Sequence, residues 1–249
     1  MKTVDIEQAI KSDGLRIVIV KAMPSAWGVA AKAMIEYKGL DYVCAYQIPM
    51  SDNPELLAWS GTNSGPVVAW NDEPPINRWE DILLLLERLA PEPRLVPEEP
   101  AERIEVFGIS REICGEVGFG WNRRIDLMRP AAGDAPSPFA QKYHYREAEA
   151  ALANSRVIAL MGELANRLKK QKENGSNYLV GSVVTAADFY WAAFSNFVQI
   201  QPQEECPINP DARPMFENTS AEITAAIDPI LIEHRDYIMH TYYKLPLEL

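Results

Sequence analysis

The hydrophobic pattern of the chain changes character near residue 100. Before that point, short apolar runs alternate with amphipathic stretches, and the β-branched run Leu15–Val20 predicts a buried strand. Residues 1–14 are expected to hold one short helix that ends at Gly14. The further elements predicted in this part are, in chain order, a helix at 26–38, a strand at 41–47, a short helix at 53–59, a strand at 65–70, an edge strand at 75–77 and a helix at 78–89.

From Ala101 onward the pattern is helical. Apolar residues recur every four positions from Ile109 to Ile125, with Val117 and Trp121 between them, which predicts a single packing stripe. The longer segments predicted beyond it are a loop at 129–138, one long helix at 139–172, a loop at 201–219 and a helical region at 220–244, in which Pro229 either kinks the helix or starts a second one.

One segment of the helical part, residues 178–194, combines a turn, a cap and an apolar helix. Thr185 and Asp188 have the spacing of a capping box, in which each residue satisfies a backbone N–H of the first turn. The residues that follow, from Phe189 to Phe194, are apolar on every side. A helix of this kind is predicted to be buried inside a helical core rather than to lie on a surface.

Three stretches resemble the cytosolic glutathione transferase superfamily. LVGSVVTAADFYWA resembles the segment fLvGd-x-x-(Ser/Thr)-x-A-D of its helical domain, NPELLAWSGTNSGPVV resembles NPEFLALNPxGKVPVL, and ILLLLERLAPEPRLVPEEPAER resembles aIleYLeerYPEPpLlPxDPxeR. The resemblance implies an α/β plus all-α architecture. It divides the chain into a thioredoxin-like domain at 1–90, with 1–14 as an extension, a linker at 91–100 and an all-helical C-terminal domain at 101–249.

Ser25 is the catalytic residue that the resemblance implies. It follows the first predicted strand and directly precedes a helix, where a hydroxyl lies at the positive end of the helix dipole and can donate to a thiolate. Lowering the pKa of a thiol from about 8.5 toward neutrality increases the reactive thiolate. The alternative is that Ser25 is a plain helix N-cap.

The resemblance also implies a cis proline at Pro66 and a thiol-binding segment, Gly65–Val67, whose backbone would pair with glutathione as an added strand does. Two positions depart from the family pattern. Ser64 and Gly65 stand where the family carries Lys before Val-Pro, and Arg78-Trp79 stand where it carries Glu-Ser. Arg78 would bind a carboxylate or phosphate rather than an ammonium, and Glu80 and Asp81 are the alternatives for the missing Glu. Glutathione binding in a modified way, a different anionic ligand and a vestigial site therefore all remain open.

Aromatic residues are the candidates for an apolar substrate pocket, for which the cleft between domains is the usual place. Trp27, beside Ser25, and Phe119 and Trp121, on the glycine-interrupted helix, are the residues we expect to line it. The alternative for each of them, taken alone, is a residue of the hydrophobic core.

Composition narrows the function classes. The net charge of −11 disfavours nucleic acid and anionic membranes as partners. No apolar run reaches the ~18 residues of a membrane span. The three cysteines lie far apart and the three histidines lack metal-ligand spacing, so a reducing, cytoplasmic location and no metal site are expected.

The sequence therefore predicts a glutathione transferase-like enzyme that activates a thiol, with glutathione as co-substrate, for attack on an apolar electrophile. The resemblance further implies a homodimer. Two alternatives stay open: a non-catalytic binding or scaffold protein of the same fold, and an enzyme that uses a different anionic ligand read by Arg78.

Overall fold

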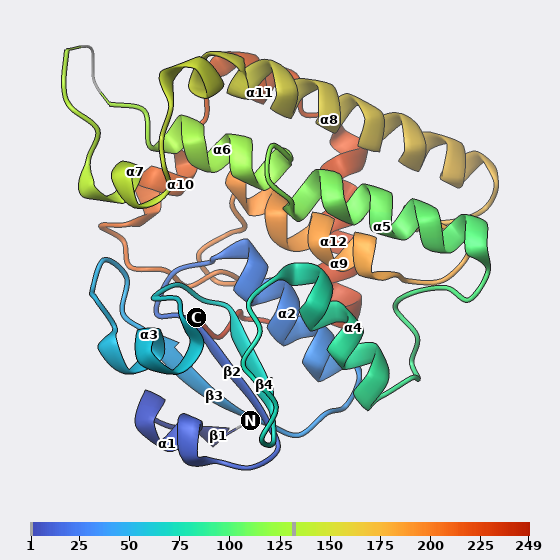
Figure 1. Ribbon diagram of the computed structural model, residues 1–249. Coiled ribbons are helices and arrows are strands. Elements are labelled where there is room, and N and C mark those ends of the chain that lie inside the picture. The colour runs from blue at the N-terminus through green and yellow to red at the C-terminus, as the bar shows by residue number, and fades with distance from the viewer. Residues whose placement is uncertain (1, 131–132) are drawn as a thin grey trace. The chain divides into compact units, whose positions relative to one another are not determined.

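The computed structural model describes residues 2–130 and 133–249, which form two compact units (Figure 1). Unit 1 comprises Met1–Val96, Gln201–Asn209 and Ile238–Leu249, and unit 2 comprises Pro97–Ile200 and Pro210–Tyr237. Part of the predicted loop at 129–138, residues 131 and 132, lies outside the described residues.

The C-terminal tail differs from the expected succession of two domains, because it belongs with unit 1. Its apolar side chains Tyr243 and Leu247 are buried there. Glu248 accepts a hydrogen bond from the Lys32 ammonium at 3.0 Å. Both kinds of contact tie the last residues of the chain to the α/β unit, which the helical pattern of the tail does not predict.

Unit 1 is built on a four-stranded sheet with the order β1-β3-β2-β4. Its strands are β1 (Lys2–Thr3), β2 (Leu15–Val20), β3 (Tyr42–Gln47) and β4 (Val67–Trp70). Its helices are α1 (Ile6–Lys11), α2 (Ala26–Tyr37), α3 (Pro54–Ser60) and α4 (Trp79–Leu89). β1 and β2 run parallel to β3, and β4 runs antiparallel to β2.

Both faces of this sheet are covered. Val18, Ala45 and Val67 pack with Leu56 of α3 in one buried cluster. The next residue of β2, Ile19, points to the opposite face, where α2 approaches so closely that a Cβ on Gly28 would lie 3.2 Å from the Ile19 side chain. A strand covered on both faces favours apolar residues at successive positions, which explains the apolar run at 17–20 that predicted β2.

Two predictions for unit 1 are wrong in detail. The first residues contain β1 as well as α1, and β1 was missed because its two residues are exposed and carry no apolar pattern. The predicted edge strand at 75–77 is reduced to one bridge, in which Ile76 exchanges backbone hydrogen bonds of 2.8 Å with Val68.

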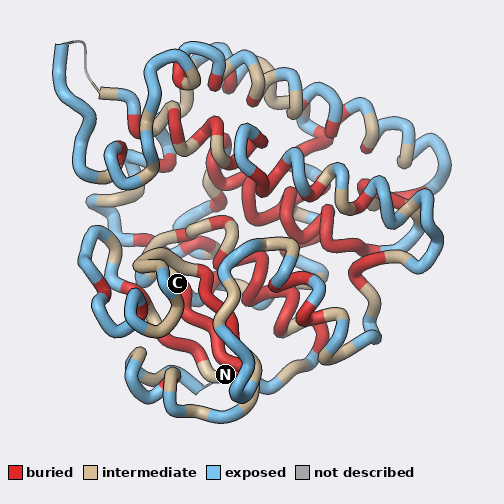
Figure 2. The backbone as a smooth tube through the Cα atoms, viewed as in Figure 1, coloured by how far each residue is buried: buried red, intermediate tan, exposed pale blue. Residues whose placement is uncertain are grey.

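Unit 2 is helical. Its elements are α5 (Pro100–Cys114), α6 (Phe119–Leu127), α7 (Pro138–Lys142), α8 (Glu147–Glu173), α9 (Ala186–Phe194), the 3-10 helix η1 (Ser195–Phe197), α10 (Arg213–Glu217) and α11 (Ala221–Ala225), and α12 (Pro229–Tyr242) runs from unit 2 into unit 1. All nine residues of α9 are buried, as the apolar pattern predicts (Figure 2). Pro229 starts a second helix rather than kinking one.

A buried carboxylate fixes the start of α9. Asp188 accepts hydrogen bonds from the Thr185 N–H at 2.8 Å and from the Thr185 hydroxyl at 2.9 Å. It also accepts one from the Leu179 N–H at 2.7 Å and lies 3.0 Å from Nε2 of His234 on α12. The predicted capping box is present, and the structure adds two partners from more distant parts of the chain.

Three predictions for unit 2 are corrected. The expected helix at 139–172 is broken, because His144 adopts a left-handed conformation with φ of 53° and separates α7 from α8. The predicted stripe, with an apolar residue at every fourth position, is interrupted at Val117. This residue is 50% exposed and has φ of 68° in the turn between α5 and α6. The predicted loop at 201–219 contains the short helix α10.

Candidate functional site

The strand register gathers the predicted thiol-binding residues at one end of the sheet. Val20 at the end of β2 lies opposite Gln47 at the end of β3, and Val67 at the start of β4 lies opposite Val18. Gly65 and Pro66 therefore lie where the parallel strands end. The chain after Ile76 runs antiparallel to β4, so it returns to the same end of the sheet, where α4 begins.

Ser25 lies at this end, in the connection between β2 and α2. It directly precedes α2, as predicted, at the N-cap position of that helix, and its side chain is half-buried. Its hydroxyl makes no capping hydrogen bond to the helix, whose first turn contains no acidic residue. The hydroxyl is therefore not used by the helix, and the partial positive charge of the α2 N-terminus is not offset by a neighbouring carboxylate of that turn.

The segment at 65–67 is fixed against β2. The Gly65-Pro66 peptide bond is cis, as the resemblance implied, and Pro66 and Val67 are buried. A Cβ at Gly65 would lie 2.9 Å from the Val18 carbonyl oxygen, which is closer than side-chain carbons approach. This close approach explains the glycine at a position where the family carries a larger residue.

Gln47 and Asn53 also hold the site in place, although neither was predicted as a site residue. Oε1 of Gln47 accepts a hydrogen bond from the Gly65 N–H at 2.9 Å. Asn53 accepts from the Ile48 N–H and donates to the Ile48 carbonyl, both at 2.9 Å, and so holds the turn that follows β3. For Gln47, the signal in the sequence was a polar residue at the end of a predicted buried strand. A buried polar side chain at such a position needs a hydrogen-bond partner.

Arg78 and Trp79 lie at the start of α4. Trp79 is half-buried, whereas the Arg78 side chain is 67% exposed. The Arg78 guanidinium pairs with Glu80 and lies 3.9 Å from Asp81. Its charge is therefore shared with two carboxylates of the same turn, which reduces the ability of Arg78 to bind an anionic ligand.

The aromatic candidates differ in exposure. Trp27, in the first turn of α2, is half-buried. Trp121 is also half-buried and is stacked by the Arg124 guanidinium at 5.6 Å from its ring centre. Phe119 is fully buried and packs edge-on against Trp191 of α9, with ring centres 5.3 Å apart, so it contributes mainly to the helical core.

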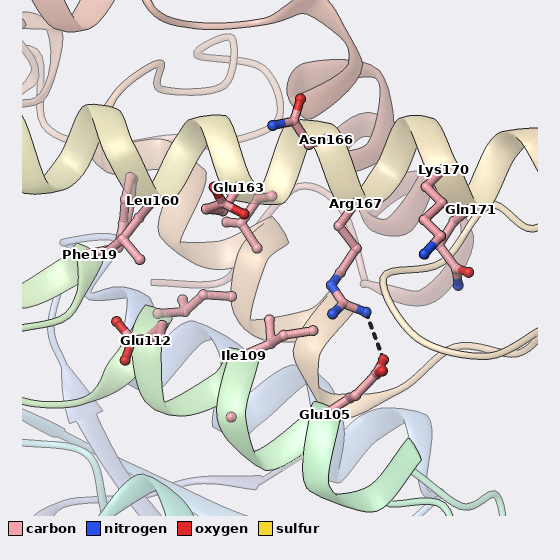
Figure 3. Close-up of a pocket in the computed structure, with 13 residues that line it drawn as sticks. Glu105, Ile109, Glu112, Phe119, Leu160, Glu163, Asn166, Arg167, Lys170 and Gln171 are labelled. Atoms are coloured by element: carbon pink, nitrogen blue, oxygen red, sulfur yellow. Dashed lines mark hydrogen bonds and ion pairs between the residues drawn. The ribbon is translucent and has the colours of Figure 1, made fainter. Parts of the chain in front are cut away.

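A cavity of about 660 Å³ lies between α5 and α8 in unit 2 (Figure 3). Ile109 and Leu160 are among its apolar lining residues, and the Glu105–Arg167 ion pair of 2.6 Å crosses it. Glu112 and Glu163 lie toward one end, and Lys170 lies toward the other. Of the predicted site residues, Phe119 lines this cavity and the thiol-binding segment does not.

Catalysis by a cysteine or by a bound metal receives less support than thiol binding at the sheet end. Burial raises the pKa of the Cys44 thiol to about 11, so this residue is not a nucleophile near neutral pH. Among residues 2–130 and 133–249, no group of three His, Cys, Asp or Glu side chains is arranged to hold a metal ion. In the same part of the chain, no helix combines the length and apolar character that crossing a bilayer requires.

Comparison with protein-family models and with curated proteins finds no match for this chain. Solved structures match over most of its length. A glutathione S-transferase from Methylobacillus flagellatus KT with GSH bound has a TM-score of 0.65 and 13% sequence identity, covering 91% of this chain and 95% of that chain. Yeast Ure2p in complex with glutathione has a TM-score of 0.62 and 15% identity, with coverages of 91% and 95%. The beta-etherase LigF from Sphingobium sp. strain SYK-6 has a TM-score of 0.59 and 19% identity, with coverages of 90% and 99%.

These likenesses establish the fold. The chain has the glutathione transferase fold, with a thioredoxin-like α/β domain and a helical domain, so the predicted fold class is confirmed. The resemblance to the glutathione transferase superfamily that three sequence stretches indicated is confirmed at the level of the fold.

Proposed function

We propose that this chain binds glutathione at the sheet end formed by Gly65-Pro66-Val67 and activates its thiol through Ser25. The observation that carries the proposal is that a helix N-terminal hydroxyl without a capping bond and the segment Gly65-Pro66-Val67 lie at the same end of one sheet. A hydroxyl in this position donates to a thiolate and lowers the pKa of the thiol. The thiolate would then attack an apolar electrophile, displacing its leaving group.

Three features support glutathione as the thiol. Solved proteins of this fold bind it, as the structures from Methylobacillus flagellatus and yeast record. A tripeptide fits an extended backbone segment, to which it can add in the manner of a strand. Glu80 and Asp81, in the first turn of α4, would supply a carboxylate for the ammonium group in place of the missing Glu, in exchange for their pairing with Arg78.

Trp27 and Trp121 are our candidates for contact with the electrophile. Both side chains are half-buried, which leaves part of each indole ring accessible to an apolar ligand. Phe119 was predicted to line the same pocket, but it is buried against Trp191. It would therefore support the pocket from the helical core rather than contact the electrophile.

A second candidate function is a non-catalytic binding or scaffold protein of this fold. It is favoured by the departures at Ser64 and Arg78-Trp79 and by the Gly65 N–H, which is already bonded to Gln47. An enzyme that reads a different anionic ligand through Arg78 is less favoured, because Arg78 pairs with Glu80 and Asp81.

A glutathione-affinity column separates these candidates. We expect the purified chain to be retained and to be eluted by dissolved reduced glutathione, because the ligand would pair with the sheet end. An identical column that carries a thiol-free ligand is the control. Passage of the chain through the glutathione column without retention would contradict the enzyme proposal and favour the scaffold.

A homodimer in a reducing, cytoplasmic compartment completes the proposal. All three cysteines are buried, so the fold shields them from oxidation and from pairing between chains.

Static light scattering across a dilution series measures the mass of the assembled protein and so tests the homodimer. We expect twice the chain mass of 28.0 kDa, and a mass of one chain throughout the series would refute the dimer.

A further inference from the structure

Gln47 connects the three segments that form the candidate site. It is the last residue of β3 and is 4% exposed. Its carbonyl accepts a hydrogen bond of 2.9 Å from the N–H of Lys21, in the connection that leads to Ser25. Its side-chain oxygen accepts from Gly65, across the end of β2. The side-chain amide nitrogen points the other way, to the Ile48 carbonyl at 3.4 Å, so both ends of the amide have partners.

The bond to Gly65 uses the one backbone donor that the segment 65–67 can offer a ligand. Pro66 has no N–H. The backbone N–H and C=O of Val68 bond to Ile76, on the side of β4 that faces away from β2. Because successive residues of a strand direct these groups to opposite sides, those of Val67 point toward β2, where Val67 lies opposite Val18. The N–H of Gly65 remains, and Oε1 of Gln47 lies 2.9 Å from it.

We propose that Gln47 gates the thiol site by occupying the Gly65 N–H, so that a bound peptide must displace the Gln47 side-chain oxygen to pair with the segment. This inference rests on the proposed function, because it concerns the same site. The exchange replaces one neutral amide acceptor by another, and it leaves a buried side-chain oxygen in need of a new partner. A hydrogen bond of this kind shifts an equilibrium by about three- to ten-fold, which is the expected effect of the gate on affinity.

Variants of Gln47 distinguish a gate from a brace that merely holds the loop. Gln47→Ala removes the competing oxygen, so a gate predicts tighter binding of glutathione. Gln47→Glu supplies a charged acceptor, which bonds the Gly65 N–H more strongly, so a gate predicts weaker binding. A brace predicts weaker binding in the alanine variant, because the loop loses its anchor. The sign of the alanine effect therefore decides between the two roles.

Calorimetric titration with reduced glutathione at pH 7 makes this test. We expect the affinity to rise about three- to ten-fold in Gln47→Ala and to fall about three-fold or more in Gln47→Glu. The matched control is Gln141→Ala, whose side chain bonds the Pro136 carbonyl on the surface of unit 2, and it is expected to bind as the wild type does. If Gln47→Ala unfolds, Gln47→Met repeats the test, since it keeps the length of the side chain and has no oxygen.

The outcomes separate the two proposals. Equal binding by all variants, or weaker binding in Gln47→Ala, overturns the gate and leaves the glutathione site standing. Binding by Gln47→Ala but not by the wild type supports the gate. Absence of binding in every variant overturns the gate together with the proposed function.

Discussion

Replacing Asp188 with alanine is expected to lower the free energy of unfolding by about 3–5 kcal/mol, because it removes the sole carboxylate of a buried network. The Asp188 side chain is fully buried and accepts from the N–H groups of Leu179 and Thr185. Without it, both donors stay inside the protein unpaired, at a cost of about 1–3 kcal/mol each. The loss of the contact with His234 adds to this cost.

Guanidinium denaturation followed by far-ultraviolet circular dichroism measures the effect. Asp188→Asn keeps one oxygen acceptor and is expected to lose about half as much. Asp52→Ala is the matched control at an exposed position and should change stability by about 0.5 kcal/mol or less. A loss below 1 kcal/mol in Asp188→Ala would show that the network does not hold α9 in place.

Replacing Ser25 with alanine is expected to lower kcat/KM with an activated aryl chloride about 20-fold at pH 7. A thiol with an ordinary pKa of about 8.5 is only about 3% ionised at this pH, and lowering the pKa by about two units makes it mostly thiolate. The alanine variant loses the donor that stabilises the thiolate, so its thiol pKa rises again. The difference between variant and wild type should therefore shrink as the pH approaches 9, where the thiol ionises unaided.

The pH profile of kcat/KM distinguishes this role from a structural one. Ser25→Thr keeps the hydroxyl and should retain most of the activity, whereas a defect in folding would lower the rate equally at every pH. Parallel profiles for Ser25→Ala and the wild type would remove Ser25 from the proposed mechanism.

Local patterns predicted most of the elements around the site. β2 was predictable because both of its faces are covered, so that most of its residues are apolar. α9 was predictable because it is apolar on every side. The start of α2 at Ala26 places Ser25 at its N-cap, as expected. The cis bond at Pro66 followed from the resemblance of the surrounding motif, not from the composition of the segment.

The features that escaped prediction depend on contacts between distant residues. Gln47 finds its partner 18 residues away and His234 finds Asp188 46 residues away, and neither pairing has a local signal. The break at His144 has a similar origin. Tyr143 and Tyr145, on either side of it, pack against a buried cluster that includes Ile125 of α6, and this packing outweighs the helical pattern of 139–172.

Titrating the thiol of bound glutathione shows whether the sheet end holds a thiol whose proton Ser25 helps to remove. Ultraviolet absorbance of the thiolate, recorded against pH in the complexes of wild type and Ser25→Ala, gives the two pKa values. We expect a pKa well below that of dissolved glutathione in the wild type and a return toward it in Ser25→Ala. Equal pKa values in the two complexes would contradict it.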